Sequence, residues 1–483
     1  MKAIDAPPLL EDGELLNTTI MPIISENDIL KFFNLEKDDI QEFRITHQSD
    51  GIYICIRLNV KYHQCPVCGQ MTDKIKDYSQ KKIIHSVLNY SQCFIIYEAR
   101  RYRCPHCHKT FFEHNPFVFG SSRISVATVS NILRDLKLPN ETFTSVARRY
   151  HVSVTSVINI FDDHVRISRR PLPACLGIDE VYAFKTYKSK FVCVLVDCTD
   201  QKIVDVLPTR KKDDLISYFM LIPREEREKV LYCSFDMWET YRIVARHVFP
   251  NASCCIDKFH VVQELGRRMD KVRISAQKKY MTQIRELQQK KKNIGLTKEE
   301  EYIYEEASRH YYVLKKFNWM FISTDNRIFD PNEEKRYNRR LEGYYNYYDL
   351  FDYMVKYDRE LDIAYDLKDS VTRFYRQCHY EDAKKKLEEI IIDFRCCPIE
   401  EMSQFANTLT RWKQEIINSF MIVDREKNRK MNTAIVENRN KSIKLIKHAS
   451  NGYLNWERFR NKILFSLNSD TTYYLNIIKK EDK

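Results

Sequence analysis

The chain has 483 residues and carries 79 Lys and Arg against 67 Asp and Glu, a net charge of +12. This length is too great for one small core, so we expect three or four domains, and the basic surplus favours a polyanionic partner. The sequence has no apolar run of eighteen residues and no basic and apolar leader, which argues against a membrane span and a secretory signal and favours an intracellular protein. It also lacks a Gly-rich phosphate loop, which argues against a nucleotide-binding fingerprint.

Charge is unevenly placed along the first part of the chain. Residues 1–60 hold 5 basic and 11 acidic side chains, whereas residues 61–130 hold 10 basic and 4 acidic ones. The change of sign predicts that an acidic N-terminal segment, residues 1–45, stays away from a polyanion that the next segment contacts.

Residues 46–120 contain two Cys-x-x-Cys pairs, Cys65 with Cys68 and Cys104 with Cys107. Clustered cysteines in an intracellular chain indicate a metal rather than disulfides. Four thiolates give Zn²⁺ a closed tetrahedral shell, so the module is expected to bind one structural zinc ion. One alternative is four ordinary cysteines in a β-rich domain. The other is ligation by nearby histidines, namely His63, His106 and His108.

The 35 residues between the two pairs contain strand-like runs such as 91–98 and are predicted to form a β-hairpin. Arg100, Arg101 and Arg103 directly precede the second pair. We expect these arginines to form a basic stripe on an edge that faces DNA.

Residues 121–168 show the pattern of three short helices, at 125–137, 141–150 and 154–161, with Ser153 as the N-cap of the third. A tight turn before the last helix is typical of a helix-turn-helix, whose recognition helix enters the major groove of DNA. The alternative is a plain three-helix linker. The exposed side chains at the start of the recognition helix, suited to base edges or phosphates, would be Thr155, Ser156 and Asn159.

Residues 172–264 change to a mixed pattern of strands and helices. The pattern predicts a mixed α/β sheet with helices on its faces, in which ligands gather at strand ends. In chain order, strands are predicted at 176–184, 191–197 and 202–207, a helix at 211–221, a strand at 230–235, a helix at 238–248 and a strand at 253–256.

Acidic residues stand at the ends of two of these strands. Asp179 lies in the first strand and Asp236 directly follows the fourth, while Glu437 lies near the start of a later helix rich in Lys and Arg. Two strand-borne Asp and one helix-borne Glu suit divalent metals that act on a phosphodiester, although a lone strand-end Asp is more often a cap or turn residue. The acids that compete for these roles are Glu180, which should point to the opposite face of its strand, Asp197 and Glu239.

Residues 265–425 are rich in Lys, Glu, Tyr and Leu and show helical apolar spacing, for example at 381–393 and 400–420. They predict a large all-helical insertion before residues 426–466, which contain Glu437, and a tail at 467–483. The Lys290–Lys292 run is interpreted as a solvated helix end. Five tyrosines of the insertion are interpreted as packing groups, namely Tyr344, Tyr345, Tyr347, Tyr348 and Tyr353.

Two features carry a family resemblance. The order of three strands, helix, strand, helix and strand, with Asp on the first and fourth strands, resembles the ribonuclease-H-like core of DDE transposases and retroviral integrases. The segment 441–464, with Gly452, Tyr453, Trp456 and Phe459, closely resembles the C-terminal signature of the ISL-three-type family of bacterial insertion-sequence transposases. That family also begins with a four-cysteine zinc module and a helix-turn-helix.

The resemblance implies a multidomain α/β protein with a ribonuclease-H-like core, in which Asp179, Asp236 and Glu437 form a catalytic triad. The triad is expected to hold two Mg²⁺ or Mn²⁺ ions, roughly 3.5–4 Å apart. The family tends to show Asp-x-x-His after the fifth strand, here Asp257 and His260, which we interpret as a supporting pair. On the Glu437 helix, the candidate phosphate contacts are Arg439, Lys441, Lys444, Lys447 and His448.

The resemblance further implies that water cleaves a phosphodiester at the element's end and that the freed 3′-hydroxyl then attacks target DNA. The expected partners are double-stranded DNA, as terminal inverted repeats and as target, and a second copy of the chain in the synaptic complex. The location would be cytoplasmic and nucleoid-associated in a bacterium, with no membrane contact. The alternatives are a non-catalytic DNA-binding regulator derived from a transposase and a nuclease acting on RNA or other DNA structures.

The chain departs from the family pattern at two places. Thr433, with Asn432 beside it, stands where Asn is frequent, and Lys447-His448 stands where Lys-Arg is frequent. These departures concern details of DNA contact more than the chemistry.

Overall fold

The computed structural model of the chain describes residues 33, 35–88, 91–182, 189–323, 325–424, 429–430 and 434–475. Most of the predicted acidic segment, the predicted strand end at 183–184 and the departure at 432–433 lie outside these residues. The described residues form two compact units: one comprises those up to Ile167 and those from Asp470 onward, and the other comprises those within Ser168–Ser469. None of the helices described is both long and apolar enough to cross a membrane.

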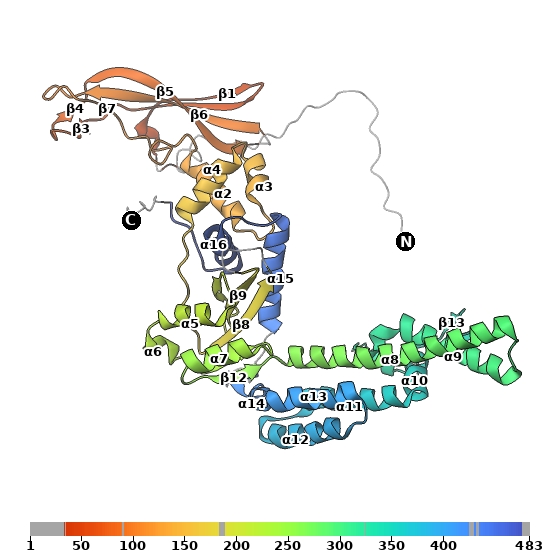
Figure 1. Ribbon diagram of the computed structural model, residues 1–483. Coiled ribbons are helices and arrows are strands. Elements are labelled where there is room, and N and C mark those ends of the chain that lie inside the picture. The colour runs from red at the N-terminus through yellow and green to blue at the C-terminus, as the bar shows by residue number, and fades with distance from the viewer. Residues whose placement is uncertain are drawn as a thin grey trace, which may run out of the picture. The chain divides into compact units, whose positions relative to one another are not determined.

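The first unit contains a five-stranded sheet of order β1–β2–β6–β5, with β7 beside β6 (Figure 1). Strands β5 and β6 are antiparallel, which confirms the hairpin predicted between the two Cys pairs. Alternate residues such as Ile54, Ile83 and Ile95 are buried in one apolar core, as strand periodicity requires. The strands span Ile40–Gln48 (β1), Gly51–Leu58 (β2), Ile75–Leu88 (β5), Ser91–Arg103 (β6) and Thr110–Phe112 (β7), and the 3₁₀ turn Lys37–Asp39 precedes β1.

Three helices follow the sheet in the first unit, close to their predicted positions. They are α2 (Val126–Leu136), α3 (Phe143–Arg149) and α4 (Val154–His164). Each begins at a hydroxyl N-cap, and Ser153 accepts from the Ser156 amide as predicted. His151, at a φ of 52°, forms the tight turn before α4.

The end of the chain also belongs to the first unit. The Tyr473 hydroxyl lies 2.6 Å from Ser130 Oγ on α2, and the Tyr474 amide donates to the His164 carbonyl of α4 at 3.1 Å. Lys137, just after α2, donates to the Thr471 hydroxyl at 3.1 Å. The predicted tail, 467–483, therefore contains a segment, residues 471–474, that joins two of the three helices.

The second unit is built on a five-stranded mixed sheet of order β10–β9–β8–β11–β12. The first three strands pair antiparallel, while β11 is parallel to both β8 and β12. Each described strand and both long helices lie close to their predicted positions. The elements are β8 (Cys175–Tyr182), β9 (Phe191–Asp197), β10 (Ile203–Leu207), α5 (Lys212–Met220), α6 (Arg224–Arg227), β11 (Tyr232–Phe235), α7 (Glu239–Val248) and β12 (Ser253–Ile256).

Helices cover both faces of this sheet. Leu176 and Ile178 of β8 belong to the core that includes Phe219 of α5 and Val244 of α7. The residue between them, Gly177, faces the other helical layer, because a Cβ there would lie only 2.7 Å from a methyl carbon of Val436. That layer contains α15 (Ala434–Ala449), and α16 (Trp456–Leu467) follows it.

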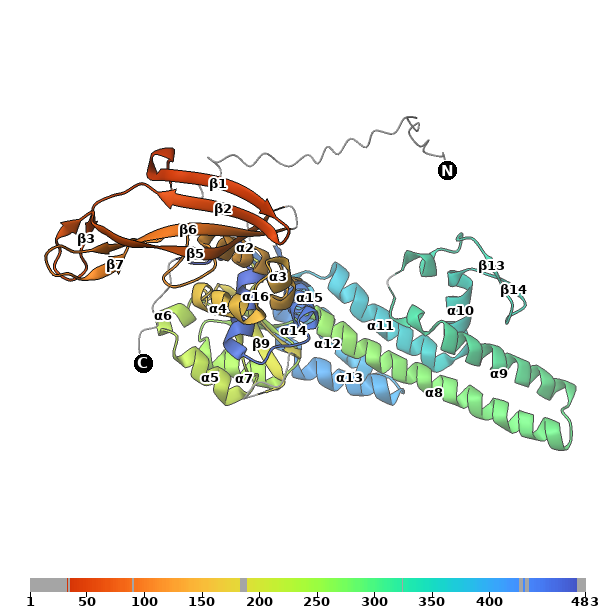
Figure 2. The ribbon, with the colours of Figure 1, turned by 90° about the horizontal axis from the view of Figure 1, so that it is seen from above.

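A long helical insertion separates β12 from α15, and α8 and α9 run side by side away from the sheet (Figures 1 and 2). The helices are α8 (Lys258–Asn293), α9 (Lys298–Lys316), α10 (Tyr347–Tyr357), α11 (Arg359–Gln377), α12 (Tyr380–Cys396), α13 (Glu400–Arg411) and α14 (Lys413–Asn418), with 3₁₀ turns at Asn318–Phe321 and Asn326–Phe329. Lys290–Lys292 end α8, as predicted.

Two expectations for the insertion need correction. It is not entirely helical, because β13 (Arg336–Asn338) and β14 (Gly343–Tyr345) form an antiparallel ribbon, and β15 (Ile422–Asp424) pairs with β16 (Arg429–Lys430). Tyr344 is not a packing group, since it is 68% exposed and contacts Tyr337 across the ribbon. A short ribbon buries little surface, so Tyr337 and Tyr344 remain largely in solvent, while Tyr345 packs against the apolar core.

Candidate active site and zinc centre

The two Cys pairs face each other in the first unit. One lies in the turn between β3 (His63–Gln64) and β4 (Met71–Thr72), and the other in the turn between β6 and β7. The ligand atoms of Cys65, Cys68, Cys104 and Cys107 all lie within 4.8 Å of one another, with two Sγ–Sγ distances of 3.5 Å. A tetrahedron with Zn–S bonds of about 2.3 Å has edges of about 3.8 Å, so the cluster fits Zn²⁺.

Backbone geometry favours the thiolate form of two of these thiols, Cys65 and Cys104, whereas the neighbouring thiols help to raise the pKa of Cys107 to about 12. Gly69 and His108 have φ angles of 72° and 56°, which close the two turns. The Cys68 amide, the largest contribution, lowers the pKa of Cys65 to about 6, and the Cys107 amide lowers the pKa of Cys104. A lower pKa favours the thiolate, which is the form that binds zinc.

The prediction that Arg100 faces DNA is wrong, because its side chain is 0% exposed. Its guanidinium donates to Gln41 Oε1 at 2.8 Å and to the Asn59 carbonyl at 3.3 Å, and it lies 3.6 Å from the Glu113 carboxylate. These polar partners, rather than the apolar core, bury Arg100, since the β6 residues of that core are the odd-numbered Cys93, Ile95, Tyr97 and Ala99.

The other two arginines of β6 are accessible to solvent. Arg101 binds the Asp77 carboxylate, with Nε–Oδ1 at 2.9 Å, and Arg103 is exposed. Of the three predicted DNA contacts in this strand, two therefore lie at the surface.

The predicted contacts of the third helix lie at the start of α4. Thr155 and Asn159 are exposed, and Ser156 is half-buried beside the N-cap, with its Oγ 2.8 Å from Ser153 Oγ. Ser156 and Asn159 line a groove of about 460 Å³, to which Arg123 also contributes.

The second unit contains a cleft of about 780 Å³ at the end of its sheet, lined by Asp179, Asp236 and Glu437 together. Asp179 lies within β8 rather than at its end, and Asp236 directly follows β11. Because the two strands are parallel neighbours with Ser234 opposite Gly177, the two Asp lie side by side. Helix α15 lies against β8 because Gly177 has no side chain, and this contact brings Glu437 to the same cleft. The structure thus brings the three predicted acids into one cleft.

Each acid is held differently. Asp179 accepts from the Glu180 amide through Oδ1 and from Asn440 Nδ2 through Oδ2, both at 2.7 Å. Asp236 Oδ1 accepts from the Trp238 amide at 3.1 Å. The Glu437 carboxylate lies 3.1 Å from Lys441 Nζ, four residues later on the helix.

Burial dominates the electrostatics of the two strand-borne acids. Desolvation raises the pKa of Asp179 to about 6, and the nearby charge of Asp236 adds to this effect. Desolvation also raises the pKa of Asp236, while the proximity of His260 lowers it. Two adjacent buried carboxylates need a compensating cation to be ionised together at neutral pH.

The donor set suits a hard divalent cation, because it consists of carboxylate oxygens in a shared cleft. Among the described residues, the four cysteines form the one group in which three or more ligand atoms lie within 4.8 Å of one another. The carboxylates of Asp179, Asp236 and Glu437 are therefore spaced more widely than the zinc ligands.

The competing acids have other partners. Glu180 also lines the cleft, but its carboxylate bonds to Arg210 and to the Tyr241 hydroxyl of α7. Asp197 accepts from amides of the turn that follows it. Glu239 binds Arg242 at 2.9 Å and lies outside the cleft lining.

Asp257 and His260, the predicted supporting pair, have different positions relative to the cleft. The Asp257 side chain caps α8 by accepting from the Phe259 amide at 2.9 Å, and it does not line the cleft. His260, one turn into α8, lines the cleft near Asp179 and Asp236.

Only some of the predicted phosphate contacts of α15 line the cleft. Lys441 and Lys444 line the cleft, and His448 is exposed outside its lining. Arg439 needs correction, because its guanidinium donates to the backbone carbonyls of Gln201 and Leu467 at 2.8 and 3.3 Å. Lys447 donates to the Tyr182 carbonyl at 3.1 Å and lies outside the cleft lining.

The insertion supplies a wall of the cleft that sequence reasoning missed. Helices α8 and α13 carry its residues, namely Gln263, Glu264, Arg267, Asn407, Thr408 and Arg411, with Trp412 directly after α13. Because these residues lie far from the acids in sequence, no local pattern signals their role.

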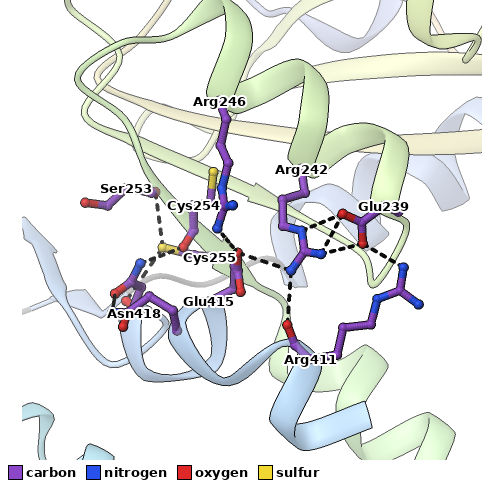
Figure 3. A network of polar contacts seen from close by, with 10 residues as sticks. Glu239, Arg242, Arg246, Ser253, Cys254, Cys255, Arg411, Glu415 and Asn418 are labelled. Atoms are coloured by element: carbon purple, nitrogen blue, oxygen red, sulfur yellow. Dashed lines mark hydrogen bonds and ion pairs between the residues drawn. The ribbon is translucent and has the colours of Figure 1, made fainter. Parts of the chain in front are cut away.

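A network of ion pairs and hydrogen bonds anchors this wall to the sheet (Figure 3). Glu415 of α14 is 2% exposed, and Arg246 of α7 binds it at 2.8 Å. Arg411 binds Glu239 at 2.8 Å, and Asn418 donates to the carbonyl of Cys254 in β12 at 2.8 Å. Because Arg246 and Arg411 are 61% and 58% exposed, solvent screens their ion pairs, and the buried Glu415 and Asn418 contribute most to holding the wall.

Comparison with known proteins identifies the family. Residues 176–463 match the ISL3 family model, described as "Transposase", and residues 61–107 match the zinc-finger of the transposases of IS204, IS1001, IS1096 and IS1165. The chain is also similar to the transposase for insertion sequence element IS1001 of Bordetella parapertussis, at 20% identity over 415 residues, which cover 85% of this chain and 90% of that protein. Because the match to the ISL3 family model spans more than half of the chain, the chain belongs to the ISL3 family of transposases.

Proposed function

We propose that the chain is an active DNA transposase in which Asp179, Asp236 and Glu437 are the catalytic groups. One observation carries the proposal: three acids that lie far apart in sequence line the same cleft, where β11 ends beside its parallel neighbour β8. Family membership supports the reaction class.

The sheet supports a ribonuclease-H-like core. Its three antiparallel strands are followed by two parallel ones in the order β10–β9–β8–β11–β12, with helices on both faces. In that arrangement the first and fourth strands in chain order are neighbours, so Asp179 and Asp236 can act on one phosphate.

The side chains around the acids suit a DNA strand. Lys441 and Lys444 on α15 and Arg267 and Arg411 on the insertion line the cleft and would bind phosphates on either side of the scissile bond. Divalent cations held by the three acids would supply Lewis-acid stabilisation of the charge on the reacting phosphate.

The proposed reaction has two in-line displacements at phosphorus. In the first, a water oxygen bonds to phosphorus and the P–O3′ bond at the element's end breaks, which leaves a 3′-hydroxyl on the element. In the second, that 3′-oxygen bonds to a phosphorus of target DNA and displaces a target 3′-hydroxyl. Neither step needs a covalent enzyme intermediate, so the cleft requires no Ser or Tyr nucleophile.

The first unit supports recognition of the terminal repeats. Arg101 and Arg103 would contact phosphates, and Thr155, Ser156 and Asn159 of α4 would reach base edges or phosphates. Two copies of the chain would pair the two element ends.

The test is a cleavage assay with purified protein, Mg²⁺ and DNA that contains the candidate inverted repeats flanking the gene. We expect nicks at the repeat ends that disappear in Asp236→Ala. The control is Asp213→Ala, whose side chain is 93% exposed on α5. Repeat-specific binding without Mg²⁺-dependent cleavage would instead indicate a DNA-binding regulator.

A further inference from the structure

Asn440 is a polar residue on the apolar face of α15. It is 6% exposed, and Val436, Ile443 and Ile446 on the same face are buried around it in the helical register. Leu or Ile is the usual residue at such a position. Burying an amide costs free energy unless its donors and acceptors find partners, so the bonds of Asn440 need an explanation.

The nitrogen of the Asn440 side-chain amide has a hydrogen-bond partner among the described residues, and its oxygen has none. Its Nδ2 donates to Asp179 Oδ2 at 2.7 Å, while its Oδ1 is buried and has no hydrogen-bond partner among the described residues. An ionised carboxylate offers only acceptors, so the amide must direct Nδ2 toward Asp179. Its oxygen therefore stays unpaired, on a side chain that lines the acidic cleft.

The backbone around Asn440 is arranged for this contact. Glu437 lies one turn earlier on α15, and residues three apart share a helix face. Gly177, two residues before Asp179, lets α15 approach β8 so closely that a Cβ would lie 2.7 Å from Val436 Cγ2 and 2.9 Å from Cys198 Sγ. The same approach brings the Asn440 amide within hydrogen-bonding distance of Asp179.

We propose that Asn440 is a positioning residue of this cleft, which fixes Asp179 through Nδ2 and presents Oδ1 as an additional acceptor to a hydrated divalent cation. This inference rests on the proposed function, because it assigns the acids to a cation. With its two oxygens held by Asn440 and by the Glu180 amide, the Asp179 carboxylate cannot rotate freely. A cation-bound water would supply the donor that the buried Oδ1 lacks.

The first test measures Mn²⁺ binding to the DNA-free protein. Asn440→Leu keeps the buried volume but removes both the donor and the acceptor. We expect the Mn²⁺ dissociation constant to rise about 10- to 100-fold, as for other groups that orient metal ligands, while the melting temperature without metal stays within a few degrees. The matched control is Asn438→Leu, an exposed position on the same helix, which should bind Mn²⁺ like the wild type.

A second variant separates positioning from packing. Asn440→Asp places a second carboxylate against Asp179, and the repulsion is relieved when a cation binds. We therefore expect Mn²⁺ to raise the melting temperature of Asn440→Asp by more than it raises that of the wild type. An equal rise in the two proteins would overturn the proposal.

The remaining outcomes also decide between readings. Wild-type affinity for Mn²⁺ in Asn440→Leu would overturn the proposal, as would a loss of affinity accompanied by a large fall in melting temperature. Asp179→Asn distinguishes the proposed function from this inference. If Asp179→Asn binds Mn²⁺ as the wild type does, the acidic cleft is not the cation site and the proposed function itself fails.

Discussion

At the scale of single residues, Arg210 connects the buried acids to the aromatic side chains beside them. Its guanidinium lies 4.0 Å from the Phe191 ring centre and 4.6 Å from that of Trp238, and it pairs with Glu180. Desolvation raises the pKa values of Glu180 and Asp236, and the positive charge of Arg210 opposes the rise in both. Arg210 thus helps to keep the acids ionised.

We expect Arg210→Met to weaken Mg²⁺ binding about tenfold at pH 7, because the pKa values of Asp236 and Glu180 rise further when the charge is lost. The measurement is the Mg²⁺-dependent rise in melting temperature between pH 5 and 9, whose midpoint should move to higher pH. Arg210→Lys keeps the charge and serves as the control. An unchanged midpoint in Arg210→Met would contradict this role.

The pKa of Asp179 predicts how pH affects stability. Because folding raises this pKa from 3.8 to about 6, the folded state favours the protonated acid, and the stability present below pH 4 is lost as pH rises through 6. Asp179→Asn should therefore match the wild type near pH 4 and exceed its free energy of unfolding by about 2 kcal/mol at pH 8. Chemical denaturation of both proteins at pH 4 and pH 8 measures their free energies of unfolding. The same difference between variant and wild type at both pH values would contradict the prediction.

At the scale of secondary-structure elements, segments distant in sequence complete each unit. Helix α13 forms a wall of the acidic cleft, and its successor α14 is anchored through Glu415. In the first unit, the segment after Asp470 joins α2 to α4 through Tyr473 and His164. The last described residues are thus part of the three-helix fold.

Tyr473→Phe should destabilise the first unit by about 1 kcal/mol, because it removes the 2.6 Å hydrogen bond to Ser130. The expected observation is faster amide hydrogen exchange in α2, with exchange in the second unit unchanged. Thr472→Ala, at an exposed neighbouring position, should leave exchange in α2 as it is in the wild type. Equal exchange in the two variants would show that the tail does not stabilise α2.

At the scale of the whole molecule, the zinc cluster and the acidic cleft lie in different compact units. Each unit has its own apolar core, so loss of one metal centre need not unfold the other unit. This separation matches the proposed division between recognition and chemistry.

Cys104→Ser should lower bound zinc from about one equivalent to well below one and weaken binding to the repeats, because the cluster ties the β3–β4 turn to the end of β6. Mn²⁺ binding at the acidic cleft should be unchanged. Zinc content is measured by metal analysis, and Cys55→Ser in β2 is the control. Loss of Mn²⁺ binding together with zinc would show that the two units unfold as one.

The sequence by itself determined the features that depend on local pattern. The spacing of Cys65, Cys68, Cys104 and Cys107 predicted their cluster, and periodicity located the core strands and the three short helices. Such patterns are readable because burial of one face imposes a period of 2 on strands and about 3.6 on helices.

Only the tertiary structure decided which side chains meet. Arg100 was placed at the surface because its polar partners could not be foreseen, and Tyr344 was placed in the core although only its neighbour Tyr345 packs there. The contact of Asn440 with Asp179, and that of Glu415 with Arg246, join residues from elements far apart in the chain. No local periodicity encodes such contacts, because they arise from the way whole helices pack against the sheet.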